Sequence, residues 1–278
     1  MTNILRPVSG RTRVFAILAD PIHHVKTPEE MNNLMTELGL DQIMVPFHVK
    51  PENLASVVSG LRGIESLDGF IVTVPHKSSI IDLCDTLSPA AKMVGAANVV
   101  RRTKDGLHGD MLDGVGFVAG LRNAGFEPTG KTAYLAGAGG AANAIAFSLA
   151  EAGVRKLTVA NRTRSKAELL VMRLREIFPK IDFEAGSPDA SGHELVINAT
   201  SMGLNETDPY PLDVESLTAD QVVAEIIMQP EYTPLLTYAA TLGCKVHLGR
   251  PMLKCQIEYM AMAMGVDIHS QRQNRVQK

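Results

Sequence analysis

The stretch Thr132-Ala133-Tyr134-Leu135-Ala136-Gly137-Ala138-Gly139-Gly140-Ala141-Ala142 decides the fold of this chain. Its first five residues form an apolar run typical of a buried strand, and small residues continue beyond the turn as a predicted helix. A strand, a Gly-x-Gly-x-x-Ala turn and a helix in this order are typical of a dinucleotide-binding fold. The first glycine permits the tight turn, and the second lets the backbone approach a pyrophosphate that the helix N-terminus stabilises. The residues expected to bind the cofactor here are Gly137, Ala138, Gly139, Gly140 and Ala141.

This turn lies halfway along the chain, so another domain is expected to precede it. A length of 278 residues suits about two domains. The first half alternates strand and helix patterns, which predicts an α/β domain with a largely parallel sheet. We expect strands at 13–18, 44–49 and 69–74, helices at 28–38, 51–61 and after Pro75, and a hairpin of 98–102 with 107–108.

The second half repeats this rhythm more regularly. We expect strands at 132–136, 157–160, 195–198, 222–227 and 245–248, helices at 141–152, 165–177, 233–242 and 252–264, and a frayed polar tail after Asp267. The predicted fold class is therefore α/β, with an N-terminal α/β substrate domain and a C-terminal Rossmann-type, doubly wound dinucleotide-binding domain.

Composition narrows the class of protein and its partners. Hydrophobic residues make up 45% and charged residues 21%, as in ordinary soluble domains. A net charge of −3 argues against nucleic acid or an anionic membrane as a partner, and no apolar run is long enough to span a bilayer. Cys84, Cys244 and Cys255 fit neither a disulfide framework nor a zinc site, and the histidines are too scattered for any metal. We expect a cytoplasmic protein with a small-molecule substrate and no metal, and leave monomer and homodimer open.

The residues after the second strand of the nucleotide-binding half indicate which cofactor is used. An NAD-selective site usually has an acidic residue there, to hold the ribose 2′-hydroxyl. This chain has Asn161-Arg162-Thr163, followed by Lys166. A guanidinium suits a 2′-phosphate through planar, charge-assisted hydrogen bonds. We therefore expect NADP, with NAD as the alternative.

Lys77 and Asp113 are the candidate catalytic residues. Transfer of a hydride to a ketone builds negative charge on the carbonyl oxygen, and the product alcohol needs a proton. A lysine ammonium supplies both the positive charge that stabilises this oxygen and the proton, and a carboxylate orients the lysine and holds a neighbouring hydroxyl. We expect both side chains to face a cleft beside the nicotinamide. Spacing alone does not select them, because most lysines and aspartates are solvated surface charges.

A resemblance to a known family selects them. Residues 13–265 resemble the shikimate/quinate dehydrogenase family in the order and spacing of several sequence blocks. These blocks are 20–28 (DPIHHVKTP), 72–77 (VTVPHK), 95–98 (GAAN), 109–114 (GDMLDG), 137–141 (GAGGA), 161–163 (NRT), 198–203 (NATSMG), 232–235 (YTPL) and 251–256 (PMLKCQ).

The resemblance implies a role for residues in these blocks. It implies that Lys77 and Asp113 are the catalytic pair and that the last helix returns to the N-terminal domain. The domains are then 1–112 with 250–278, which bind substrate, and 113–249, which bind the dinucleotide. The implied substrate residues are Thr27, Thr73, Asn98, Asp113 and Gln256; the implied cofactor residues add Asn161, Arg162, Thr163, Lys166, Thr200 and Met202 to the glycine turn.

The chain departs from the family pattern where the substrate carboxylate is held. The usual Ser-x-Ser or Ser-x-Thr is Val25-Lys26-Thr27, and the usual tyrosine is Met228. Further departures nearby are Ile71 and Met111-Leu112. Each lost charge-assisted hydrogen bond costs about 1.5–3 kcal/mol, so two would weaken carboxylate binding by roughly two or more orders of magnitude. His23, His24 and Lys26 are candidates to replace the missing donors.

These observations support a leading hypothesis and two alternatives. The leading hypothesis is an NADP-dependent oxidoreductase similar to shikimate dehydrogenase, acting on a ring hydroxyl or ketone of shikimate or a related alicyclic compound, with a changed substrate. The first alternative is an ordinary shikimate 5-dehydrogenase of aromatic amino-acid biosynthesis. The second is a non-catalytic NADP-binding sensor, against which the retained Lys77, Asn98, Asp113 and Gln256 argue.

Overall fold

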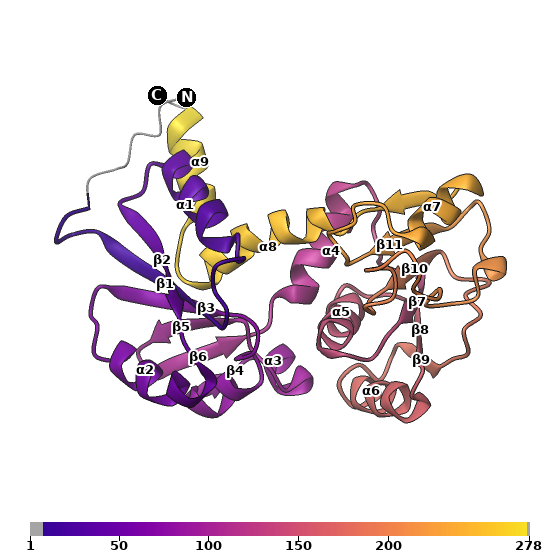
Figure 1. The fold of residues 1–278 in the computed structure, drawn as a ribbon, viewed down its shortest axis with the longest axis horizontal. Helices are drawn as coiled ribbons and strands as arrows, with labels where there is room; N and C mark the ends of the chain where they lie inside the picture. Colours follow the sequence, from indigo (N-terminus) through magenta and orange to yellow (C-terminus); the bar gives the residue numbers. More distant parts are fainter. Residues whose placement is uncertain (1–7, 277–278) are drawn as a thin grey trace. The chain divides into compact units, whose positions relative to one another are not determined.

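The computed structural model describes residues 8–276 and has an α/β fold of two compact units (Figure 1). One unit comprises the residues up to Leu112 together with those from Ile257 onward, and the other comprises Asp113–Gln256. The sequence places the return to the first unit at residue 250, but the division falls inside helix α8 (Arg250–Ala263). The reason is packing: a Cβ added to Gly116 would lie 2.9 Å from the Met252 carbonyl oxygen, so the first turns of α8 contact the second unit.

The first unit is built on a six-stranded mixed sheet. The strand order is β2 (Gln42–His48), β1 (Arg13–Ala19), β3 (Leu67–Val72), β5 (Val99–Thr103), β6 (Gly106–Asp110) and β4 (Thr86–Leu87). Strand β1 pairs in parallel with β2 and β3, whereas β5 is antiparallel to both β3 and β6. The predicted hairpin is confirmed, and because it joins the sheet, the sheet is less parallel than the sequence suggests.

The helices of this unit are α1 (Thr27–Leu38), α2 (Leu54–Leu61), α3 (Pro89–Val94) and α9 (Ile268–Val276), with 3-10 turns η1 (Pro51–Asn53) and η2 (Ser79–Leu83). Helix α1 has a proline and two acidic residues in its first turn and is capped at its end by Gly39, whose φ of 74° is left-handed. The helix expected after Pro75 is only the short 3-10 turn η2 in the described chain. The Lys77 carbonyl accepts a hydrogen bond from the Ala97 N–H (2.8 Å), so it is committed to a neighbouring segment.

The C-terminal tail differs from its predicted frayed state. Residues from Ile268 form α9, which packs beside α1 (Figure 1). Ile268 is 1% exposed, and Arg272 pairs with Glu258 of α8 at 2.6 Å. A buried apolar anchor and an ion pair to the preceding helix therefore order a sequence that is polar overall.

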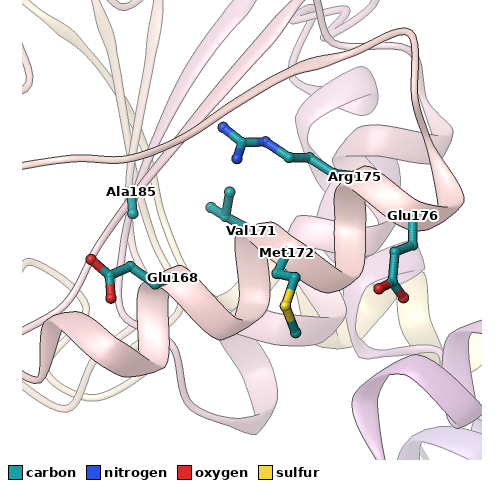
Figure 2. Close-up of a pocket in the computed structure, with 6 residues that line it drawn as sticks. All are labelled: Glu168, Val171, Met172, Arg175, Glu176 and Ala185. Carbon is teal, nitrogen blue, oxygen red and sulfur yellow. The ribbon is translucent and has the colours of Figure 1, made fainter.

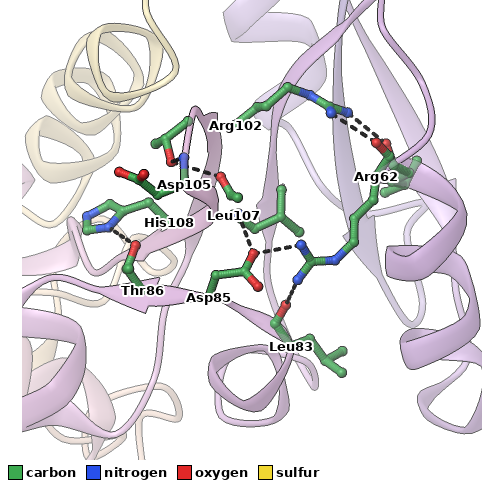
Figure 3. Close-up of polar contacts among 11 residues, drawn as sticks. Arg62, Leu83, Asp85, Thr86, Arg102, Asp105, Leu107 and His108 are labelled. Atoms are coloured by element: carbon green, nitrogen blue, oxygen red, sulfur yellow. Dashed lines mark hydrogen bonds and ion pairs between the residues drawn. The ribbon is translucent and has the colours of Figure 1, made fainter.

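Polar contacts tie α2 to the hairpin of the first unit (Figure 3). The Arg102 guanidinium donates to four carbonyls at and beyond the end of α2, namely those of Leu61, Arg62, Ile64 and Leu67. Arg62 in turn donates to Asp85 (2.6 Å), which also accepts from the Leu107 N–H. The turn η2 ends at Leu83, one residue before Cys84, and Asp85 of this network follows directly. The network therefore fixes the far end of the segment that begins at Lys77.

The second unit has a fully parallel six-stranded sheet. The strand order is β12 (Lys245–His247), β11 (Val222–Glu225), β10 (Leu195–Asn198), β7 (Thr132–Ala136), β8 (Lys156–Ala160) and β9 (Asp182–Ala185). Counted from β7, this is the 3-2-1-4-5-6 order of a dinucleotide-binding domain read from the other edge, and the order reverses between β7 and β10. The predicted fold class is confirmed. Ligands of such sheets bind beyond the carboxyl ends of the strands at that point of reversal.

The helices of the second unit are α4 (Asp113–Asn123), α5 (Gly140–Glu151), α6 (Arg164–Ile177) and α7 (Pro234–Thr241), with a 3-10 turn η3 (Val214–Ser216). Helix α4, which the sequence patterns did not predict, packs closely on α5. On one side of the sheet, Tyr134, Val196, Val223 and Leu236 belong to one buried cluster. Within residues 8–276, no helix is both long and apolar enough to cross a bilayer.

Candidate active site

The glycine turn after β7 has the geometry that a pyrophosphate requires. Gly137 has a φ of 117°, and a Cβ there would lie 2.8 Å from the Ala199 carbonyl oxygen, so only glycine fits. In contrast, no heavy atom lies within 4 Å of a Cβ built on Gly139 or Gly140, so a ligand can approach both backbones. Helix α5 starts at Gly140 without a side-chain cap, which leaves its first N–H groups available for an anion.

Basic residues gather at the start of α6, directly after β8. Arg162 and Lys166 are exposed, and neither has an ion-pair partner within the described residues. Arg164, between them in sequence, pairs instead with Glu168 at 2.9 Å. Basic side chains in the first turn of a helix are unfavourable beside the positive end of its dipole. A bound anion would relieve this repulsion, so the donor set fits a ribose 2′-phosphate.

The Asn161-Arg162-Thr163 turn itself is held by the Asn161 amide, which donates to the Thr163 carbonyl at 2.9 Å. Thr163 is the N-cap of α6 but makes no side-chain capping hydrogen bond. The N-terminal N–H groups of α6 therefore have no side-chain cap, and the same is true of those of α5.

The loop after β10 lies against the glycine turn. A Cβ on Gly137 would come within 3.2 Å of the Thr200 methyl group as well as close to Ala199. Thr200 donates from its hydroxyl to Asn198 Oδ1 (2.7 Å) and accepts from the Met202 N–H (3.0 Å). The structure therefore brings Thr200 beside the turn that the sequence assigns to the cofactor, within the second unit.

In the first unit, the predicted residues Thr73, Lys77 and Asn98 come from neighbouring backbone segments. Thr73 follows β3, and its N–H donates to the Leu18 carbonyl of β1 (3.1 Å). The Lys77 carbonyl binds the N–H of Ala97, the residue before Asn98. Asn98 is 1% exposed, and its Oδ1 accepts from the Leu112 N–H at 2.9 Å. Asn98 thus fixes the backbone immediately before Asp113.

Asp113 and Gln256 lie together in the second unit, although 143 positions separate them. Gln256 Nε2 donates to Asp113 Oδ1 at 2.6 Å, and the residues are 6% and 8% exposed. A glycine stripe on α4 permits this contact: a Cβ on Gly116 would lie 2.8 Å from that of Gln256, and one on Gly114 would overlap the Ala144 carbonyl of α5. The amide donor orients the carboxylate.

The departures from the family pattern remain apolar in the structure. Val25 and Met228 are half-buried, and Ile71, Met111 and Leu112 are buried. Thr27, the first residue of α1, is half-buried. Among the proposed substitute donors, His23 and His24 are exposed and stack edge to face, and Lys26 lies 3.8 Å from Glu29. No side chain of this segment is therefore held as a buried carboxylate donor in the described chain.

Sequence reasoning missed two buried polar residues next to predicted site segments. His76 is 1% exposed, and its Nε2 lies 2.8 Å from the Val49 carbonyl, which anchors the backbone just before Lys77. Glu225 is fully buried at the end of β11, and burial raises its pKa although four groups donate to it. A glutamate that ends the apolar run Val222-Val223-Ala224 is the signal that could have identified it.

Neither of the two described cavities is lined by a predicted site residue. A cavity of about 410 Å³ runs along α6 beside the edge strand β9 and contains no predicted cofactor residue (Figure 2). It is lined by Glu168, Val171, Met172, Arg175, Glu176 and Ala185. A second cavity of about 270 Å³ in the first unit is lined by His48, Val49, Lys50, Asn53 and Val57. In the part of the chain that is described, no group of three His, Cys, Asp or Glu side chains is arranged to hold a metal.

Comparisons with known proteins show which family the chain resembles. Residues 17–100 match the shikimate dehydrogenase substrate binding domain, and residues 122–205 match the shikimate / quinate 5-dehydrogenase family. The chain is 38% identical to a shikimate dehydrogenase (NADP(+)) of Geobacter metallireducens, over 90% of each chain.

Two solved structures are also similar over nearly the whole chain. A shikimate 5-dehydrogenase from Listeria monocytogenes, in complex with shikimate and NAD, is 28% identical with a TM-score of 0.87, covering 97% of this chain and 98% of that one. A 5-ketofructose reductase of a Gluconobacter species is 32% identical with a TM-score of 0.84, covering 95% and 98%. The chain therefore belongs to the shikimate/quinate dehydrogenase family.

Proposed function

We propose that this protein is an NADP-dependent oxidoreductase that interconverts a secondary alcohol and a ketone on a polyhydroxylated substrate without the carboxylate of shikimate. One observation carries the proposal. The polar residues expected to handle the reacting hydroxyls are retained, whereas Val25 and Met228 stand where donors to the carboxylate are expected. The likeness to a 5-ketofructose reductase supports it, because ketofructose is a polyhydroxylated ketone without a carboxylate.

The cofactor assignment rests on the glycine turn and the basic start of α6. The open backbone at Gly139 and Gly140 would hold the pyrophosphate, and Arg162 with Lys166 would hold the 2′-phosphate. When bound, NADP supplies or accepts the hydride. Thr200 and Met202 belong to the loop beside the turn and are proposed to contact the cofactor.

The chain's own residues provide the proton transfer and the orientation of the substrate. Lys77 is proposed to donate a proton to the developing alkoxide in reduction and to accept it in oxidation. Asp113, oriented by Gln256, accepts a hydrogen bond from a substrate hydroxyl. Thr27, Thr73 and Asn98 are proposed to contribute further contacts to the substrate.

A Lys77→Ala variant tests whether the protein is an enzyme. If Lys77 transfers the proton, this variant binds NADP as the wild type does but loses turnover by about 10²–10⁴-fold. Cofactor binding is measured by fluorescence titration and turnover by the absorbance of NADPH. Wild-type protein that binds NADP but reduces no ketone in a broad screen would instead indicate a sensor.

An ordinary shikimate 5-dehydrogenase is the second candidate, favoured by curated relatives such as that of Geobacter metallireducens. Steady-state kinetics separate the two. Our proposal predicts a high KM for shikimate and a higher kcat/KM for a carboxylate-free polyhydroxy ketone, tested with 5-ketofructose and NADPH. An ordinary KM and kcat for shikimate would overturn the altered substrate while leaving the oxidoreductase assignment intact.

We further propose that the protein acts in the cytoplasm as a monomer or homodimer. The free thiols of Cys84, Cys244 and Cys255 support a reducing compartment. Sedimentation equilibrium distinguishes the two assembly states.

A further inference from the structure

A buried carboxylate, that of Glu225, gathers four hydrogen bonds at the end of β11. Its Oε1 accepts from the backbone N–H groups of Ile226 (2.9 Å) and Ile227 (3.1 Å). Its Oε2 accepts from Asn198 Nδ2 (2.9 Å) and from the Thr233 hydroxyl (3.0 Å). With Glu225 and Thr233 both 0% exposed, water cannot replace any of these donors cheaply.

This carboxylate sets the direction of the hydrogen bonds in the next loop. Both oxygens of Glu225 accept hydrogen bonds, so the Asn198 amide turns its Nδ2 toward Glu225. The same Nδ2 donates to the Met202 carbonyl (2.9 Å), and Oδ1 is left to accept from the Thr200 N–H (3.0 Å) and hydroxyl (2.7 Å). Having donated its proton, the Thr200 hydroxyl accepts from the Met202 N–H.

The network reaches two segments assigned to the active site. The loop it orders packs on the glycine turn, where a Cβ on Gly137 would lie 2.8 Å from the Ala199 carbonyl oxygen. On the other side, the Ile226–Ile227 backbone that Glu225 holds packs on the start of α8. A Cβ on Gly249 would lie 2.3 Å from the Ile227 carbonyl oxygen, and α8 carries Gln256.

We propose that Glu225 is a positioning residue for the dehydrogenase reaction. Through Asn198 and Thr200 it holds the cofactor-side loop, and through Ile226 and Ile227 it supports the helix that carries Gln256. The inference rests on the proposed NADP-dependent function. It assigns a role in cofactor affinity to a side chain that is not expected to touch the cofactor.

The isosteric variant Glu225→Gln tests this role. Its amide group must point at least one N–H toward an existing donor. If this N–H faces Asn198, the Asn198 amide keeps the contact only by turning over, which opposes its Nδ2 to the Thr200 N–H. If it faces Ile226 and Ile227 instead, their backbone N–H groups lose their acceptor. We expect the dissociation constant for NADP, measured by titration of the purified variant, to rise about tenfold, equivalent to about 1.4 kcal/mol. The KM for NADP rises with it, by more than kcat falls.

Two comparisons separate positioning from general damage to the fold. Gln221→Leu removes a buried amide at the opposite end of β11, where it donates to the Ala190 and His193 carbonyls. This control is expected to lower Tm without changing the NADP affinity. The second comparison is between Thr233→Val, which removes one donor to Glu225, and Thr233→Ser, which keeps it. Only Thr233→Val is expected to weaken NADP binding.

The possible results of these experiments distinguish a failure of the proposed function from a failure of this inference. Wild-type protein that does not bind NADP overturns the proposed function and this inference with it. If the wild-type protein binds NADP, the inference alone is overturned by either of two results. In the first, Glu225→Gln binds NADP as tightly as the wild type. In the second, Gln221→Leu weakens NADP binding as much as Glu225→Gln does. If Glu225→Gln does not fold, Thr233→Val takes its place, with Thr233→Ser as the control that keeps the donor; equal NADP affinity of these two variants also overturns the inference.

Discussion

At the scale of the residue, Arg162 is predicted to decide between the two nicotinamide cofactors. Its guanidinium is exposed at the start of α6 and has no partner in the described chain, so it is available for a 2′-phosphate. Arg162→Ala removes a charge-assisted contact worth about 1.5–3 kcal/mol, which raises the KM for NADP about tenfold to a hundredfold. The KM for NAD stays the same, because NAD has no phosphate at that position.

The neighbouring Arg164 provides the matched control. It is exposed on the same first turn but is already paired with Glu168 at 2.9 Å. Arg164→Ala is expected to change the ratio of KM values for NADP and NAD less than Arg162→Ala does. An unchanged ratio in Arg162→Ala would contradict the assignment of this residue to the 2′-phosphate.

At the scale of the element, α4 depends on glycines that bring helices into close contact. A Cβ on Gly114 would lie 2.0 Å from the Ala144 carbonyl oxygen of α5, which is too close for any side chain. Gly114→Ala is therefore expected to lower the free energy of unfolding by about 1–3 kcal/mol, as overpacking does. The shift also displaces Asp113 and so reduces kcat/KM. Urea denaturation followed by circular dichroism measures the loss of stability.

Gly60 in α2 is the control for this prediction. It is exposed within a helix, and nothing lies within 4 Å of a Cβ built on it. Gly60→Ala is expected to stabilise the protein by about 0.5–1 kcal/mol, because alanine has the higher helix propensity. A loss of stability for Gly60→Ala equal to that for Gly114→Ala would mean that close packing is not the cause.

The same glycines explain where the sequence could and could not predict the structure. Strands 132–136 and 195–198 match β7 and β10, because each is a short apolar run bounded by turn signals. Helix α4 was missed because Gly114, Gly116 and Gly120 resemble a loop in sequence, and only the neighbouring helices give them a reason to be helical. The helical tail was missed likewise, since its order depends on contacts with α1 and α8.

The features of the candidate site also divide into those that the sequence could predict and those that it could not. The glycine turn is a local signal, because its function depends on backbone conformation over a few residues. The contact between Asp113 and Gln256 joins distant positions, so only the family resemblance suggested that both bind substrate. The Glu225 network depends on which strands are neighbours, and no spacing in the sequence carries that information.

At the scale of the whole molecule, carboxylates of both units respond to acid together. A basic partner lowers the pKa of Asp85, Glu184 and Glu194, and the Arg122 guanidinium lowers that of Glu127 to about 2. Because the pKa values of these groups are lower in the folded state, the groups stabilise the folded protein at pH values above their unfolded-state pKa, which is about 4. They lose this stabilising effect as the pH falls. Each pair is exposed and contributes little alone.

His247 is predicted to make stability depend on pH nearer neutrality. The ring is 4% exposed against Phe117, Nε2 has no hydrogen-bond partner in the described chain, and desolvation lowers its pKa from the ordinary value of 6.5. Below pH 6.5 the unfolded chain binds a proton at this histidine that the folded protein does not bind. As the pH falls further, the free energy of unfolding therefore decreases, by up to about 1.4 kcal/mol per pH unit. Glu225, whose pKa is raised, acts in the opposite sense.

The variant His247→Leu isolates this contribution from that of Glu225. Leucine fills a similar volume and does not titrate, so the variant is expected to be at least as stable as the wild type at pH 7. Its stability then exceeds that of the wild type by a margin that grows as the pH falls from 7 toward 5. Urea denaturation of both proteins at matched pH values gives this margin directly, and Glu225 cancels because both carry it. A margin that stays constant across that range would show that the buried imidazole does not control the response of the molecule to pH.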